Sequence, residues 1–211
     1  MGMNRAILFV MNRATPLVTL AGVFFSAGLA AQAPQRPELT AAPPSIASVM
    51  QAQLSMVESQ FVPAAEAMPE EKYTFVPTSG EFKGVRTFAL EVKHVATANL
   101  AFYSLILEQE PPPGVTLSGP ANGPSDVQSK EQILNYLKES FALGHKALAT
   151  LITQNALTVL AKPPAPSMNT PLALATFSLA HASDHYGQIV ECLRMNGIVP
   201  PASKGQPPAN P

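Results

Sequence analysis

The chain has 211 residues, 46% of them hydrophobic and 13% charged, a composition typical of one globular domain with a sizeable core. Its 13 basic and 14 acidic side chains give a net charge of −1, and lysine and arginine form no cluster. Binding to nucleic acid requires a surplus of positive charge to neutralise phosphates, so we expect no nucleic-acid partner.

Residues 1–33 have the layout of a secretory signal peptide. Two arginines precede an apolar run at 17–25, and small residues lead to Ala31-Gln32-Ala33, a pattern that a signal peptidase accepts. The apolar run is shorter than the roughly 20 residues of a membrane-spanning helix, which disfavours an uncleaved anchor. We therefore expect an exported protein, periplasmic or extracellular, with no stable membrane insertion after the signal is removed.

The 22 prolines are clustered, and the clusters mark the connections between four helical stretches. We expect a Pro/Ala-rich spacer at 34–44, one folded domain at 45–202 and a disordered tail at 203–211. The first helix is predicted at 46–68, where apolar residues recur at steps of three and four.

The second helix is predicted at 83–108, and apolar residues cover so much of its circumference that we expect it to be mostly buried. The connector before it, at 69–80, contains aromatic residues and is expected to tuck onto the bundle. After it, a loop rich in Gly, Pro, Ser and Asn continues to residue 128, a length that suggests a crossover or a feature at the rim.

The last two helices have clear signals at their ends. The segment 129–132, Ser-Lys-Glu-Gln, has the order of a capping box and opens a third helix that we expect to end near Val159. Thr-Pro at 170–171 begins the fourth helix, and Asn-Gly at 196–197 ends it. The most economical packing of four such helices is an all-α, antiparallel up-and-down four-helix bundle.

Three of the four histidines are predicted to face the interior of this bundle. His181 and His185 lie one turn apart in the last helix, and His94 has apolar residues four positions to either side. Imidazoles at i and i+4 can both reach one ion at about 2.0–2.1 Å. A shared cation would avoid the cost of burying unpaired imidazoles, about 1–3 kcal/mol for each. Separate hydrogen bonds to neighbouring groups are the alternative that the spacing leaves open.

The segment 181–188 reads His-Ala-Ser-Asp-His-Tyr-Gly-Gln, and 90–95 reads Leu-Glu-Val-Lys-His-Val. They resemble the last-helix motif H-x-x-x-H-x-G-Q and the second-helix histidine of the DinB-like superfamily of small metal-binding four-helix-bundle proteins. The resemblance covers about 46–201. It implies that His94, His181 and His185 bind one divalent ion, most often zinc or nickel. Three protein ligands leave one position open to water or a substrate thiolate, as in catalytic zinc sites.

Glu91 and Asp184 are the candidate catalytic carboxylates. Glu91 lies three residues before His94, and Asp184 lies three residues after His181, so either could orient a ligand imidazole or handle a proton. A solvated surface position is the alternative for each. Ala182 stands where a zincin would carry its glutamate, so a thermolysin-type mechanism has no candidate base.

Two other side chains, His145 and Cys192, are expected to take no part in metal binding or catalysis. His145, near the apolar stripe of the third helix, is expected at the rim of the bundle rather than as a fourth ligand. Cys192, the only cysteine, cannot form an internal disulfide, and it is expected as a buried helix residue rather than a catalytic thiol, because no positive group beside it would lower its pKa.

These features favour an exported metal-dependent enzyme, a hydrolase or a thiol-type transferase, whose small-molecule substrate the sequence does not identify. Thiol cofactors are scarce outside the cytoplasm, which favours hydrolysis. The alternative is a non-catalytic module of the cell envelope that binds a metal or a small ligand, because no general base is obvious. The sequence does not decide whether two chains form a homodimer through an exposed helix face.

Overall fold

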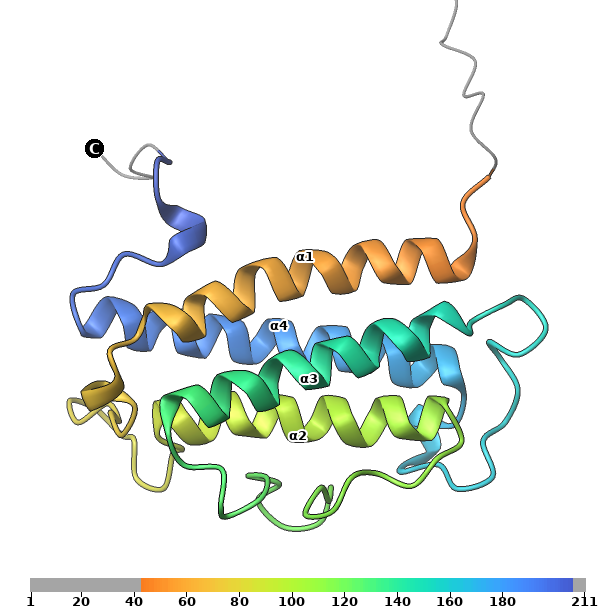
Figure 1. Cartoon of the computed structure of the whole chain (residues 1–211), viewed down its shortest axis with the longest axis horizontal. Helices are drawn as coiled ribbons and strands as arrows, with labels where there is room; N and C mark the ends of the chain where they lie inside the picture. The colour runs from red at the N-terminus through yellow and green to blue at the C-terminus, as the bar shows by residue number, and fades with distance from the viewer. Residues whose placement is uncertain (1–42, 207–211) are drawn as a thin grey trace, which may run out of the picture. The chain divides into compact units, whose positions relative to one another are not determined.

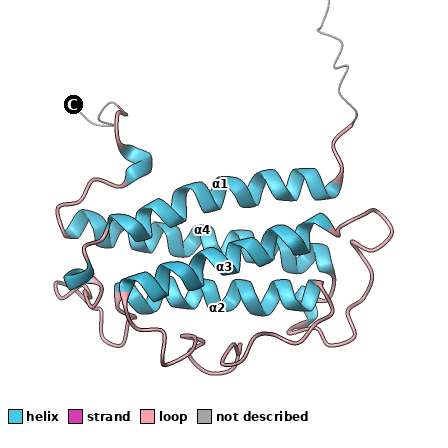
Figure 2. Cartoon of the chain, in the orientation of Figure 1, coloured by secondary structure: helices cyan, strands magenta, loops and turns pink. Residues whose placement is uncertain are grey.

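The computed structural model describes residues 43–206, which form a bundle of four long helices joined by loops (Figure 1; Figure 2). The expected signal peptide, all but the last two residues of the spacer and the end of the tail lie outside this range. The helices are α1 Ile46–Ala67, α2 Phe88–Ile106, α3 Lys130–Ala149 and α4 Pro171–Met195. The described range contains no strand, and the expected all-α four-helix bundle is confirmed.

Each long helix begins after a serine or threonine that caps it. The side-chain oxygens of Ser45, Thr87, Ser129 and Thr170 each accept a hydrogen bond from a backbone N–H of the first turn, which would otherwise lack a partner. The capping box expected at 129–132 is present. The helix α2 begins later than the expected residue 83, because Gly84 has a left-handed backbone (φ +82°) that a helix cannot include.

The helix α3 ends at Ala149, so the expectation of an end near Val159 was wrong. Asn155 holds the following turn: its side chain accepts from the Ile152 N–H at 2.8 Å and donates to the Thr150 carbonyl at 2.8 Å. Such side-chain bonds to the backbone compete with helix continuation. Ile152, which lies within the expected third helix but beyond the end of α3, is exposed.

In the bundle, α1 and α2 each pack against both α3 and α4. The neighbouring helices α2 and α4 are antiparallel (Figure 1). By contrast, α2 and α3 run in the same direction: Thr97 contacts Tyr136 and, further along both helices, Asn99 contacts Ser140. The strict up-and-down alternation is therefore broken at one connection. The loop 107–129 returns along the bundle before α3 begins, which is the crossover that its length suggested.

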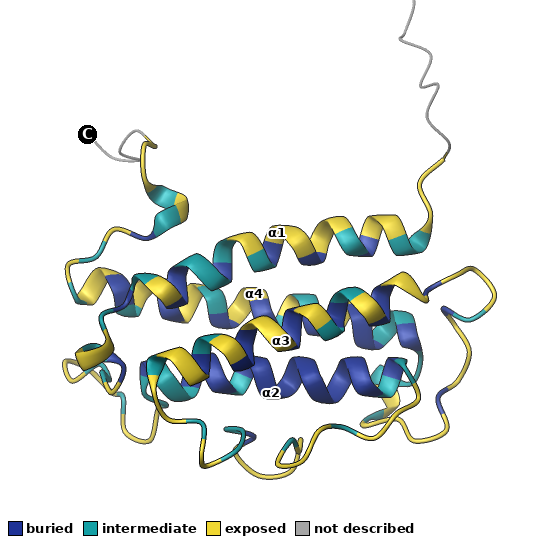
Figure 3. Cartoon of the chain, viewed as in Figure 1, coloured by how far each residue is buried: buried dark blue, intermediate teal, exposed yellow. Residues whose placement is uncertain are grey.

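The helix α2 is the most enclosed of the four (Figure 3). The connector ahead of it packs onto the bundle as expected: Tyr73 is buried, and the carbonyls of Tyr73 and Phe75 accept from the N–H groups of Ala89 and Phe88. These bonds fix the first turn of α2, which carries Glu91. No helix in residues 43–206 combines the length and the apolar character needed to cross a bilayer.

Candidate metal centre

His94 from α2 and His181 and His185 from α4 bring their rings together where the two helices face each other. Nε2 of His181 lies 3.2 Å from Nε2 of His94 and 3.1 Å from Nε2 of His185. The ring centroids of His94 and His185 are 4.8 Å apart. The structure thus brings together the three histidines that the sequence singled out, in a group that could hold a metal ion.

His94 is oriented by the crossover loop. Its Nδ1 lies 3.1 Å from the carbonyl oxygen of Ala121, and because a carbonyl can only accept, Nδ1 carries the proton and Nε2 keeps its lone pair. Burial lowers the pKa of His94, and the positive charge of Arg86 acts in the same direction. The ring of His94 is therefore neutral, and its unprotonated Nε2 faces the other two histidines as a possible metal ligand.

His185 is oriented by Glu91. The carboxylate accepts a hydrogen bond from Nδ1 of His185, which again leaves Nε2 free to bind a cation. The second carboxylate oxygen of Glu91 lies 3.7 Å from the guanidinium of Arg86. Burial by itself would raise the pKa of Glu91, but the hydrogen bond and charge of His185 and the charge of Arg86 outweigh it, so this pKa is lowered. Glu91 therefore supplies a fixed negative charge beside the three rings.

His181 lies between the other two histidines and an aromatic pair. Its ring stacks against Phe177, with centroids 5.9 Å apart, and meets Phe102 edge-on. Burial, together with the charges of His185 and His94, lowers the pKa of His181 to about 4. At neutral pH the ring is uncharged, and its buried Nδ1 has no hydrogen-bond partner among the described residues.

The cluster fits a divalent ion on three counts. Two nitrogens that bind one tetrahedral ion at about 2.0–2.1 Å lie about 3.3 Å apart. The two pairs that include His181 are 3.1 and 3.2 Å apart, and all three ligand atoms lie within 4.8 Å of one another. The Nδ1 protons of His94 and His185 are held by acceptors, so the Nε2 atoms of these two rings have lone pairs available for a shared cation. Imidazole donors suit zinc and nickel, whereas hard ions such as magnesium and calcium prefer oxygen.

The other candidates lie elsewhere. Asp184 is exposed and accepts a hydrogen bond from Nε2 of Gln188 at 3.0 Å rather than from a ligand imidazole. His145 contacts Glu58 and Gln51 of α1, so it is not close to the three histidines. Cys192 is half-buried on α4.

Sequence reasoning missed Arg86 and Ala121. Arg86 donates to the side chain of Asn122 at 2.9 Å and to the carbonyl of Pro120 at 3.0 Å, and so holds the crossover loop where Ala121 can meet His94. Ala121 has a positive φ of 48°, a conformation that costs a non-glycine residue free energy. A backbone carbonyl has no signature in the sequence, and an arginine in a loop reads as a surface residue.

Comparison with known proteins agrees with this geometry. A search of curated proteins found no match. A family model, described as the DinB superfamily, matches residues 53–189. The matched stretch contains all three histidines and Glu91 and is more than half of the chain, and the chain therefore belongs to the DinB superfamily.

Proposed function

We propose that the chain binds one divalent metal ion, zinc or nickel, through Nε2 of His94, His181 and His185, and uses it in a reaction on a small molecule. The supporting observation is that the three imidazoles bring their Nε2 atoms together, while acceptors hold the Nδ1 protons of two of them. Separate hydrogen bonds would not require all three Nε2 atoms to converge.

Such an ion supplies an open coordination position that can take water or another donor and lower its pKa toward 7. The chain's own residues prepare the site. Glu91 fixes the ring of His185, and the Ala121 carbonyl fixes the ring of His94, so little reorganisation is needed when the ion binds. Hydrolysis is favoured over thiol transfer if the chain is exported, as residues 1–33 suggest.

A second candidate is a non-catalytic module that binds a metal or a small ligand. It is favoured by the surroundings of the two candidate carboxylates. Glu91 is already engaged by His185 and Arg86, and Asp184 lies at the surface. Neither is free to accept a proton from a molecule at the cluster, which a general base must do.

The metal content of the purified chain tests whether the three histidines bind an ion. Elemental analysis of the purified chain should give about one zinc or nickel per chain. The variants His94→Ala and His185→Ala should lose it, whereas His145→Ala, which removes the one histidine outside the cluster, should retain it. Equal metal content in all four proteins would refute the proposed site.

Turnover then separates the two candidates. The metal-loaded chain is assayed on panels of esters, amides and thiol-reactive electrophiles. Activity that disappears in His94→Ala and His185→Ala, but not in His145→Ala, supports the enzyme. Tight metal binding without turnover on any panel favours the binding module.

Export is a separate part of the proposal. We propose that residues 1–33 direct the chain out of the cytoplasm, because they combine a positive start, a short apolar run and an A-x-A site. Expression of the full chain in bacterial cells, followed by fractionation and mass measurement, tests it. A shortened chain outside the cytoplasm is expected, and a full-length chain confined to the cytoplasm would contradict export.

A further inference from the structure

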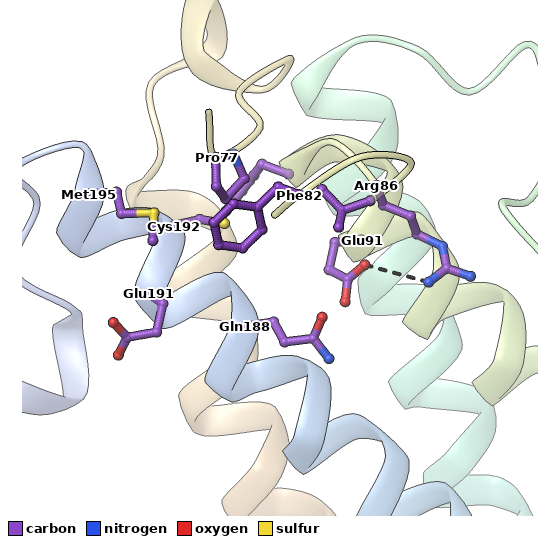
Figure 4. Close-up of a pocket in the computed structure, with 10 residues that line it drawn as sticks. Pro77, Phe82, Arg86, Glu91, Gln188, Glu191, Cys192 and Met195 are labelled. Atoms are coloured by element: carbon purple, nitrogen blue, oxygen red, sulfur yellow. Dashed lines mark ion pairs between the residues drawn. The ribbon is translucent and has the colours of Figure 1, made fainter. Parts of the chain in front are cut away.

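A cavity of about 280 Å³ lies close to the histidine cluster, between α2, α4 and the connector that precedes α2 (Figure 4). Its size is near the lower end of the range for small-molecule sites, about 300–1,000 Å³. Most of the wall is apolar, formed by Pro77, Phe82, Val85, Phe88, Cys192 and Met195.

The cavity continues the interface that holds the histidines. On α4, Gln188, Cys192 and Met195 follow His185 at steps of three and four, so they lie on the same helix face. At about 1.5 Å per residue, Cys192 is about 10 Å along the helix from His185. Glu91 belongs to both places, since it binds His185 and also lines the cavity. A molecule in the cavity would therefore extend toward the histidines past Glu91.

The charges at the cavity are already compensated within the protein. Arg86 faces Glu91 and donates to the crossover loop, and Glu191 lies 3.8 Å from Arg194. Burial raises the pKa of the Cys192 thiol, as do the nearby carboxylates Glu91 and Glu191, so the thiol is uncharged at neutral pH. An ionised ligand would lose its hydration without meeting an unpaired opposite charge.

We propose that this cavity binds an uncharged apolar group, about the size of one substituted aromatic ring, that belongs to the small molecule on which the metal centre acts. The assignment of a substrate class rests on the proposed function. Apolar walls favour such a group through burial of its surface, and the compensated charges disfavour a carboxylate or an ammonium group.

Cys192 provides a reporter within the cavity wall. It is the only cysteine of the chain, so every alkylation by iodoacetamide, followed by intact mass, reports this position. The rate is measured on the purified full chain with and without benzyl alcohol, and with and without benzoate, which has the same ring but a negative charge. Saturating benzyl alcohol should slow alkylation about tenfold, whereas benzoate at equal concentration should change the rate by less than about twofold.

A matched pair of variants controls for surface effects. Val85, at the cavity, is 45% exposed, and Val49, on α1, is 46% exposed. The compared quantity is the benzyl alcohol concentration that gives half of the maximal protection of Cys192. It should be about ten times higher in Val85→Asp, because a carboxylate now lies in the apolar wall. In Val49→Asp it should equal that of the wild type. Saturation-transfer NMR of benzyl alcohol makes the same comparison without depending on the thiol. Equal protection by benzoate, half-protection of Val85→Asp at the same benzyl alcohol concentration as in the wild type, or no binding by either method would overturn the proposal.

Metal-free and metal-loaded protein are both measured, which separates this inference from the function on which it rests. Protection by benzyl alcohol in a chain that binds no metal would leave the cavity site standing while the metal function fails. Metal binding without any protection by benzyl alcohol would support the metal site and refute the cavity site.

Discussion

Glu91 and Asp184 have equivalent places in the sequence, each three residues from a predicted ligand, but opposite surroundings in the structure. Glu91 is buried and accepts from His185 across the helix interface, whereas Asp184 is exposed and bonded to Gln188. Spacing predicted only that Glu91 could orient a ligand imidazole or handle a proton, and His94 is the ligand nearest to it along α2. The relative register of α2 and α4 selects His185 instead, and spacing within one helix cannot reveal that register.

The variant Glu91→Gln should weaken metal binding by about 10–100-fold, because it keeps the shape of the side chain but removes the negative charge that holds the His185 ring. Competition titration with a chelator measures the affinity. The control Asp184→Asn makes the same chemical change at the surface and should alter the affinity by less than about twofold. A comparable loss in both variants would show that general charge, rather than the bond to His185, is responsible.

The inward direction of the three histidines was predictable because a helical repeat fixes which residues share a face, and their use as one metal site was implied by the family resemblance rather than by the spacing. The groups that orient them were not predictable to the same degree. Ala121 acts through its backbone carbonyl, and its position depends on Arg86 holding a loop that has no regular periodicity.

At the scale of elements, the crossover loop 107–129 decides both the topology and the site. Proline and glycine predicted where α2 stops, but they do not state in which direction α3 then runs. By returning along α2, the loop makes α2 and α3 parallel and places Ala121 against His94 and Pro124 against Lys93, whose ammonium donates to the Pro124 carbonyl at 2.7 Å. The end of α3 was similarly unpredictable, because local side-chain bonds stop it before its apolar pattern does.

Two helical glycines should respond in opposite ways to alanine. At Gly144 of α3, a Cβ would lie 2.6 Å from the buried ring of Tyr103 and 2.9 Å from Leu54, so Gly144→Ala should destabilise the chain by about 1–2 kcal/mol despite its better helix propensity. At Gly187 of α4, a Cβ would meet nothing within 4 Å, so Gly187→Ala should stabilise it by up to about 1 kcal/mol. Urea denaturation measures both. A Gly144→Ala chain as stable as the wild type would mean that α2 and α3 are less closely packed than described.

At the scale of the whole bundle, α2 links the other helices through polar contacts as well as apolar ones. Asn99 donates to Ser140 of α3 at 3.3 Å and accepts from Ser178 of α4 at 3.0 Å, in the buried layer beyond the histidines. The proposed metal would add another link between α2 and α4, which are far apart in the sequence. Apolar periodicity predicted the four helices and their buried faces, but these partners depend on how the helices are arranged, which the crossover determines.

If the ion links α2 and α4 only in the folded chain, it should stabilise the whole bundle. Zinc at 100 times its Kd should raise the free energy of unfolding by about 2.7 kcal/mol, because it binds the folded state in preference to the unfolded state. For a domain of this size the gain corresponds to a rise in Tm of about 5–11 °C. Melting followed by circular dichroism, with and without a chelator, measures the shift. His145→Ala should show the full rise and His185→Ala almost none, since it lacks one ligand. An equal rise of Tm in both variants would show that zinc binds outside the cluster, and would refute the proposal that the ion links α2 and α4.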